Sequence, residues 1–258
     1  MHRAFAAALM ILLATRAADA AEITVFSSGI TRAALLRLGA AWSKETGHSV
    51  NVTNGNVIAM VEYANSEQRG DLVLLPPNDI SGVSARLMPN TTIFVGRALF
   101  GLAAKAGAPR PDISTVEKFA AVLKAAASVG HPSGTSMSGA MIAEMLKRPE
   151  FAGVTIIPLR ENAETIAATG HAQYGAGTIS EELSNPGAQL VGLFPEALGM
   201  RIEFSAAVLA RSMAPEAALS FLRFITGPAA TAGWHACGIE RPEQDVNAAR
   251  LPCSVTAP

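Results

Sequence analysis

Residues 22–29 have the sequence EITVFSSG, which gives the clearest local signal for the class of fold. Its first five residues are rich in β-branched and aromatic side chains, which favours a strand, and Ser27-Ser28-Gly29 then form a polar turn. Residues 31–46 carry leucine and alanine at helical spacing and stop at Gly47, which predicts a helix. Parallel α/β sheets are built from this order of strand, turn and helix.

The same order is repeated further along the chain. Residues 49–53 predict a second strand, followed by the turn Asn54-Gly55-Asn56 and a helix over residues 57–68. Residues 71–75 form an apolar run that is typical of a strand buried on both faces. We therefore expect an α/β protein with doubly wound, mainly parallel sheets.

The second half of the chain continues the alternation after a long apolar run over residues 93–104. Ser114, with Glu117 three residues later, predicts a capping box at the start of a helix that reaches residue 127. The further strands expected from the pattern are 128–131, 154–157, 174–179, 189–193 and 203–210, and the further helices are 138–146, 162–169, 215–225 and 229–235.

The first twenty residues have the pattern of an export signal. Arg3 supplies the positive start, residues 4–13 are apolar, and Ala18-Asp19-Ala20 is a cleavage site of small residues. An apolar run of about ten residues is too short to span a membrane, which needs about twenty. We expect a periplasmic protein that is mature from about Ala21; the alternative is an uncleaved N-terminal anchor.

The composition excludes some classes of function. The charge is balanced, with 20 basic and 21 acidic residues, and this argues against a nucleic-acid partner. We expect a monomer. We also expect neither a cofactor nor a metal, because there is no dinucleotide or Walker pattern and the histidines lack ligand spacing. The histidines concerned are His48, His131, His171 and His235.

Two cysteines, Cys237 and Cys253, lie near the C-terminus. In an exported protein such a pair usually forms a disulfide. This one would close a loop of about 15 residues and contribute roughly 3 kcal/mol in the chain-entropy model. The alternative is a redox or metal-binding pair.

Four polar segments follow predicted strands and form the candidate ligand site. In open parallel sheets, ligands bind outside the carboxyl ends of the strands, and helix N-termini there favour anions. Two segments lie on each side of Ile93, which predicts a ligand held between two lobes. The alternative is that these residues are ordinary helix caps and turns. The segments are Ser27-Ser28-Gly29, Asn54-Gly55-Asn56 with Val57, Ser133-Gly134-Thr135-Ser136, and Thr178-Ile179-Ser180-Glu181.

Arg97 lies inside the apolar run that begins at Ile93. A buried arginine needs an acidic partner or a bound anion. We favour a structural ion pair and keep Arg97 among the candidate ligand residues.

The chain resembles the periplasmic substrate-binding proteins of the molybdate-binding type. The resemblance implies a type II periplasmic-binding-protein fold, in which two α/β lobes joined by crossover strands hold a small anion. Lobe 1 would comprise residues 22–94 plus 199–258, and lobe 2 residues 95–198. The stretches that carry the resemblance are residues 23–29, 45–50, 69–74, 215–222 and 227–230.

Two positions depart from the family pattern. Val57 stands where the family usually has a serine, and Thr178 stands where a tyrosine usually precedes a Ser-Asp pair. Residues 106–114 and 179–181 are more similar to a divergent branch of solute-binding proteins that includes an aconitate isomerase.

Two functions follow as expectations. The first is a solute-binding protein that delivers a small anion, an organic carboxylate rather than molybdate, to an inner-membrane ABC importer. Its hydrogen-bond donors would be Ser28, Asn56, Ser133, Thr135 and Ser180. The second is an isomerase acting on a tricarboxylate, which needs a general base close to an acidic C–H; His131 and Glu181 are the candidates.

Overall fold

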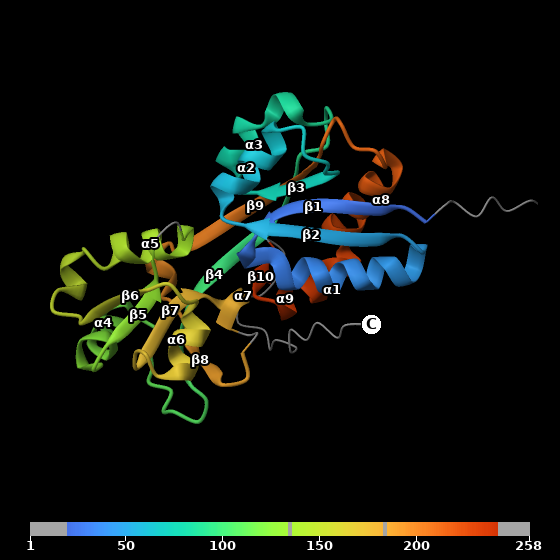
Figure 1. Cartoon of the computed structure of the whole chain (residues 1–258). Coiled ribbons are helices and arrows are strands. Elements are labelled where there is room, and N and C mark those ends of the chain that lie inside the picture. Colours follow the sequence, from blue (N-terminus) through green and yellow to red (C-terminus); the bar gives the residue numbers. More distant parts are fainter. Residues whose placement is uncertain (1–19, 134–135, 183–184, 242–258) are drawn as a thin grey trace, which may run out of the picture.

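The structure is a computed structural model that describes residues 20–133, 136–182 and 185–241. It is an α/β protein with two lobes joined by long strands (Figure 1), as the sequence predicted. One mixed sheet runs through both lobes in the order β2-β1-β3-β9-β4-β7-β5-β6. None of the helices in the described segments is long and apolar enough to cross a membrane.

Lobe 1 is built on three parallel strands. β1 (Glu22–Ser28) lies between β2 (Ser49–Gly55) and β3 (Leu72–Leu75), and β9 (Arg201–Val208) joins β3 in the antiparallel direction. β3 is fully buried, as its apolar run predicted. The helices of this lobe are α1 (Gly29–Thr46), α2 (Val57–Asn65), α3 (Pro77–Gly82), α8 (Pro215–Thr226) and α9 (Thr231–Ala236), with short 3-10 turns at Ser84–Arg86 and Pro228–Ala230.

Lobe 2 also contains three parallel strands. β5 (Val129–Pro132) lies between β6 (Ile156–Leu159) and β7 (Tyr174–Thr178), and both pairings are parallel. Its helices are α4 (Val116–Ala125), α5 (Met137–Met145), α6 (Ala163–Thr169) and α7 (Ile179–Glu182), with 3-10 turns at Pro149–Phe151 and Glu196–Leu198.

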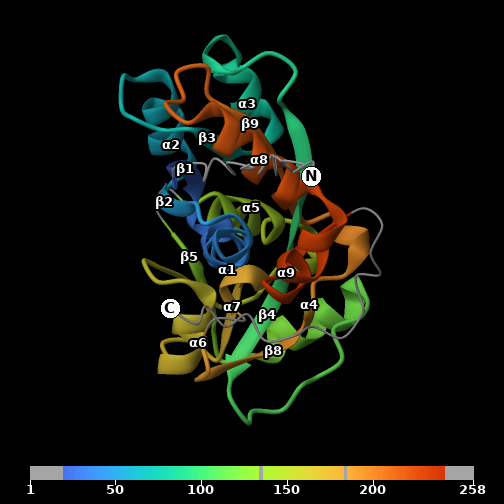
Figure 2. The same cartoon turned by 90° about the vertical axis from the view of Figure 1, so that its right-hand side faces the viewer.

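The strand β4 (Ile93–Lys105) crosses from one lobe to the other. Its first half pairs with β9 and with the two-residue β10 (Ile239–Glu240), and its second half pairs with β7 and β8 (Ala188–Leu193). Figure 2 shows β4 running the length of the molecule. The predicted boundaries, residues 22–94 plus 199–258 for lobe 1 and 95–198 for lobe 2, stay a proposal. In this proposal the chain passes between the lobes in β4 and at the start of β9.

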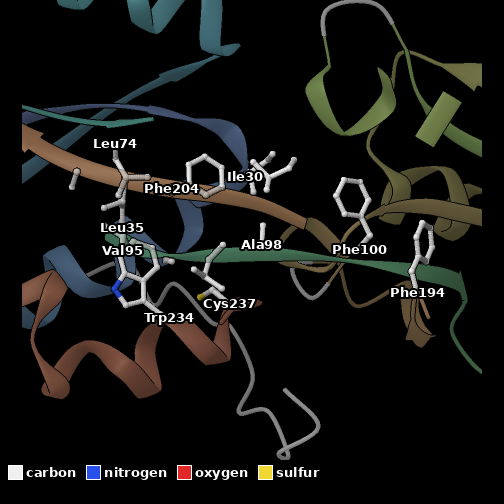
Figure 3. Close-up of a cluster of buried hydrophobic side chains, with 14 of the residues drawn as sticks. Ile30, Leu35, Leu74, Val95, Ala98, Phe100, Phe194, Phe204, Trp234 and Cys237 are labelled. Atoms are coloured by element: carbon white, nitrogen blue, oxygen red, sulfur yellow. The ribbon is translucent and has the colours of Figure 1, made fainter. Parts of the chain in front are cut away.

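The main hydrophobic core follows β4 through both lobes. Figure 3 shows Ile30, from the first turn of α1, and Phe204, from β9, on one side of β4, with Trp234 on the other side and Phe194 at the lobe 2 end. Ile30 is 8% exposed, so the start of α1 is fixed against the crossing strands.

Four local expectations were wrong. The helix α4 begins one residue later than predicted, because Thr115 and not Ser114 accepts the capping bond from Lys118 N–H, at 3.3 Å. Residues 77–82 form α3, for which no helix was predicted, and Pro77 fits its first turn because proline suits the first position of a helix. β6 lies two residues after its expected start. Ile179, expected at the end of the strand 174–179, is instead the first residue of the short helix α7.

Two further predictions concern the chain ends. Residues 1–19, which contain most of the predicted signal, lie outside the described residues. Cys237 is buried, but Cys253 also lies outside them, so the disulfide stays a prediction.

Candidate functional site

The carboxyl ends of the strands in the two lobes point towards each other. Leu75, at the end of β3, lies opposite Ser205 of β9, which lies opposite Phe94 of β4. Thr178, at the end of β7, lies opposite Phe100 of β4. β3 runs in the same direction as β4 and β7 runs against it, so both carboxyl ends point towards the middle of β4. Helices α1 and α7 contact each other across this region.

Ser27 and Ser28 are adjacent, but their hydroxyl groups have different surroundings. Ser27 Oγ lies 3.3 Å from the carbonyl oxygen of Leu74 and also bonds Thr31 Oγ1, so it is satisfied within lobe 1. Ser28 is 3% exposed, and its Oγ has no hydrogen-bond partner among the described residues. Ser28 is also the N-cap of α1 and makes no side-chain capping bond. A buried hydroxyl without a partner is rare and requires an explanation.

The segment after β2 forms the capped start of α2, and the start of α1 has open space beside it. Asn56 caps α2 by accepting a bond from Ala59 N–H at 2.8 Å, and Val57 is the first residue of that helix. Asn54 is an exposed residue of β2. Gly29, the first residue of α1, has no atom within 4 Å of the place where a Cβ would lie. None of these residues lines the two pockets described below.

Lobe 2 supplies its own hydroxyl groups at the ends of β5 and β7. Ser133 follows β5, and its N–H donates to the carbonyl oxygen of Leu159 at 2.7 Å. Ser136 caps α5 by accepting a bond from Gly139 N–H at 3.2 Å. The hydroxyl of Ser180 donates to Thr178 Oγ1 at 3.3 Å, and both residues are buried. Gly134 and Thr135 lie outside the described residues.

The C-terminal segment of lobe 1 holds α7 in place. Gly238 has a positive φ of 74°, and a Cβ there would lie 2.7 Å from the backbone nitrogen of Ser180. The next residues form β10 beside β4. A glycine is therefore needed where lobe 1 approaches the start of α7.

His131 is the candidate base with a described geometry. It is 5% exposed, and its Nδ1 lies 2.8 Å from the carbonyl oxygen of Pro132. A carbonyl oxygen only accepts, so Nδ1 carries the proton of this bond, and in the neutral ring Nε2 is then the basic nitrogen. Glu181 lies in α7, but its side chain is outside the described part of the chain.

A pocket of about 280 Å³ lies between the lobes, and we call it the interlobe pocket. The sequence patterns do not single out the residues that line this pocket. Pro76 nevertheless directly follows a buried strand, so the rule that ligands bind beyond the carboxyl ends of parallel strands applies to it as well. Burial raises the pKa of Asp79, the neighbour of Asn78 in the first turn of α3, above its ordinary value. The pocket is lined by Pro76, Pro77 and Asn78 from lobe 1, by Met137 and Met141 of α5, and by Arg201, Ile202 and Glu203 at the start of β9.

Arg97 does not line the interlobe pocket. It lines a second pocket of about 450 Å³ at the crossing of the strands, which we call the hinge pocket. The ion pair that we favoured for Arg97 is not found within the described residues. No group of three metal-binding side chains is found within them either.

Comparisons with known proteins agree with this fold. The sequence profile of the bacterial extracellular solute-binding proteins matches residues 23–240. An aconitate isomerase from Pseudomonas sp. is 27% identical over 214 residues, which cover 79% of this chain and 81% of the isomerase.

Two solved structures share the fold at low identity. The periplasmic molybdate-binding protein of Azotobacter vinelandii matches with a TM-score of 0.67 and 15% identity, over 86% of this chain and 100% of that one. The sulfate-binding protein SubI of Mycobacterium tuberculosis H37Rv matches with a TM-score of 0.66 and 17% identity, over 86% of this chain and 88% of that one. The chain belongs to the bacterial extracellular solute-binding protein family, and its fold is that of the molybdate-binding-like periplasmic proteins.

Proposed function

We propose that this protein is a periplasmic binding protein that holds a small organic carboxylate between its lobes and delivers it to an inner-membrane ABC importer. The observation that carries the proposal is Ser28 Oγ, a buried hydroxyl without a partner at the start of the 18-residue helix α1. The first N–H groups of a helix and its dipole favour a negative charge at this place.

The chemistry of the interlobe pocket favours a carbon skeleton over a bare oxyanion. Pro76, Pro77, Met137 and Met141 give apolar walls, which a tetrahedral oxyanion cannot use. Arg201 and Glu203 line the same pocket and lie 3.5 Å apart, so this ion pair adds polar groups at the edge of the pocket. An organic acid can use both kinds of wall, with its carboxylates at the helix starts and its carbon atoms against the apolar side chains.

The residues proposed to bind the ligand are those at the carboxyl ends of the strands. Ser28, Ser133 and Ser180 supply hydroxyl groups, and the starts of α1, α2 and α5 supply N–H groups. We keep Asn56 and Thr135 in the proposed set of donors. Cleavage after Ala20, a Cys237–Cys253 disulfide and a monomeric state complete the proposal.

An isomerase of the aconitate type is the alternative, favoured by the 27% identical relative. Moving a double bond within aconitate requires a base that removes one proton and returns one to another carbon. His131 Nε2 is the proposed base, because the bond of Nδ1 to Pro132 leaves the other nitrogen basic in the neutral ring.

One experiment separates the two functions. The purified mature protein is incubated with trans-aconitate, and the cis isomer is followed by chromatography. Thermal shifts are measured in parallel with molybdate, sulfate, citrate and trans-aconitate, because a ligand that binds only the native state raises Tm.

Each outcome favours or contradicts one of the two proposed functions. A carboxylate that raises Tm without turnover supports the binding protein. Turnover that His131→Gln abolishes, while trans-aconitate still raises Tm, establishes the isomerase. A shift with molybdate or sulfate and none with a carboxylate contradicts the choice of an organic acid.

A further inference from the structure

The hinge pocket is separate in chemistry from the interlobe pocket, although Arg201 touches both. Its volume of about 450 Å³ is in the range of small-molecule sites. Its walls come from the middle of β4, from the loop before α4 and from the segment between β8 and β9. Leu99, Ile113, Phe194 and Met200 make much of this wall apolar.

Arg97 brings a positive charge to this apolar pocket. Its Nε is buried and has no hydrogen-bond partner in the part of the chain that the structure describes. Two glutamates lie opposite it on the neighbouring strands, Glu203 on β9 and Glu240 on β10. However, Glu203 lies 3.5 Å from Arg201 and Glu240 lies 3.6 Å from His235. Among the described residues, no carboxylate oxygen lies within ion-pair distance of the Arg97 guanidinium.

The other charges around the hinge pocket are balanced or at its rim. Asp112 lies 2.6 Å from Lys118 Nζ and also accepts the N–H of Ser114 at 2.9 Å. Arg201 is paired with Glu203, and Glu196 is exposed. The guanidinium of Arg97 is therefore the positively charged group of this pocket that has no ion pair among the described residues.

We propose that the hinge pocket binds a small carboxylate with an apolar body. The carboxylate would accept two hydrogen bonds from the Nε and an Nη of Arg97, which is the preferred geometry of this pair. The apolar body would lie against Leu99, Phe194 and Met200. Such a ligand would remove the cost of a buried donor without a partner.

Phenylacetate is the probe for this site, and 2-phenylethanol is its match without the carboxylate. The protein is labelled with ¹³C at the methionine methyl groups and titrated while NMR spectra are recorded. Met200 reports on the hinge pocket, and Met137 and Met141 report on the interlobe pocket. Conservative leucine variants assign the three signals.

We expect phenylacetate to shift the Met200 signal in a saturable way, with much smaller shifts for Met137 and Met141. Arg97→Gln should weaken this binding by about tenfold or more, the equivalent of one charge-assisted hydrogen bond. Arg86→Gln is the control, because Arg86 is an exposed arginine paired with Glu67 at 3.7 Å. Arg97→Lys keeps the charge but lacks the two-pronged geometry, and should also weaken binding.

Three results would overturn the proposal. The first is an unchanged Met200 signal up to the solubility limit of phenylacetate. The second is equal binding of 2-phenylethanol. The third is equal binding by the Arg97→Gln and Arg86→Gln proteins. Circular dichroism checks that the variants fold. If the Arg97→Gln protein does not fold, the Arg97→Lys protein replaces it in the comparison with Arg86→Gln. The Met137 and Met141 signals report binding in the interlobe pocket separately. A failure of the hinge-pocket proposal can therefore be distinguished from a failure of the proposed transport function.

Discussion

Replacing Ser28 by alanine tests the candidate site most directly, because the neighbouring Ser27→Ala variant is its matched control. The two serines are consecutive residues of β1 and both are buried. Ser27 Oγ is bonded to Leu74 and Thr31, whereas Ser28 Oγ has no partner among the described residues. The same chemical change should therefore have opposite effects at the two positions.

The expected magnitudes follow from these contacts. Ser27→Ala removes two hydrogen bonds of about 1 kcal/mol each, so the free energy of unfolding should fall by about 1–2 kcal/mol. Ser28→Ala removes a buried group without a partner, so the ligand-free protein should be equally stable or more stable by up to about 1 kcal/mol. If Ser28 donates to a bound carboxylate, its loss costs about 1.5–3 kcal/mol of binding. That cost equals a roughly 10- to 150-fold rise in Kd.

Two measurements give these quantities. Urea unfolding followed by circular dichroism gives the stability without ligand, and the denaturant slope checks that the transition stays comparable. Calorimetric titration with the tightest anion of the thermal shift panel gives Kd. The reasoning fails if Ser28→Ala destabilises the ligand-free protein as much as Ser27→Ala does. It also fails if Ser28→Ala leaves Kd unchanged.

Three further predictions concern other parts of the fold. Gly238→Ala should lower the free energy of unfolding by about 1–3 kcal/mol more than Gly153→Ala does. Both glycines have a positive φ, but only Gly238 lies against a neighbouring backbone. Urea unfolding of both variants measures the difference. Thr115→Ala should cost about 1 kcal/mol of stability by the same assay, because it removes the N-cap of α4. The hydrogen bond and charge of Lys118 hold the pKa of Asp112 well below its usual range. Lys118→Met should therefore raise the pKa of Asp112 in an NMR titration, and an unchanged pKa would contradict this cause.

The local sequence was sufficient to predict most of the elements. Residues 22–75 have regular alternation and clear turn residues, and the three strands and two helices expected there are present. The errors arose where two local signals compete. Ser114 and Thr115 both suit a helix cap, and the sequence cannot show that the N–H of Ser114 is bonded to Asp112 Oδ1, at 2.9 Å.

The candidate site was predicted in outline and not in its details. The rule that ligands bind beyond the carboxyl ends of parallel strands pointed to Ser27 and Ser28 together. Their separate roles depend on the pairing of Ser27 with Leu74 on β3, which is a long-range contact. The hinge pocket depends even more on long-range contacts, because Arg97 meets a wall formed by residues 191–201. No local pattern contains that information.

The strand directions also explain why this fold suits an anion. α1 and α2 begin at the carboxyl edge of lobe 1, and α5 begins at the carboxyl edge of lobe 2. Because both edges point towards the middle of β4, the positive ends of these helices face the same space. An anion between them would be attracted by the positive end of each helix. We therefore expect an anion to bind more tightly in this space than a neutral solute of the same shape, which would lack this contribution.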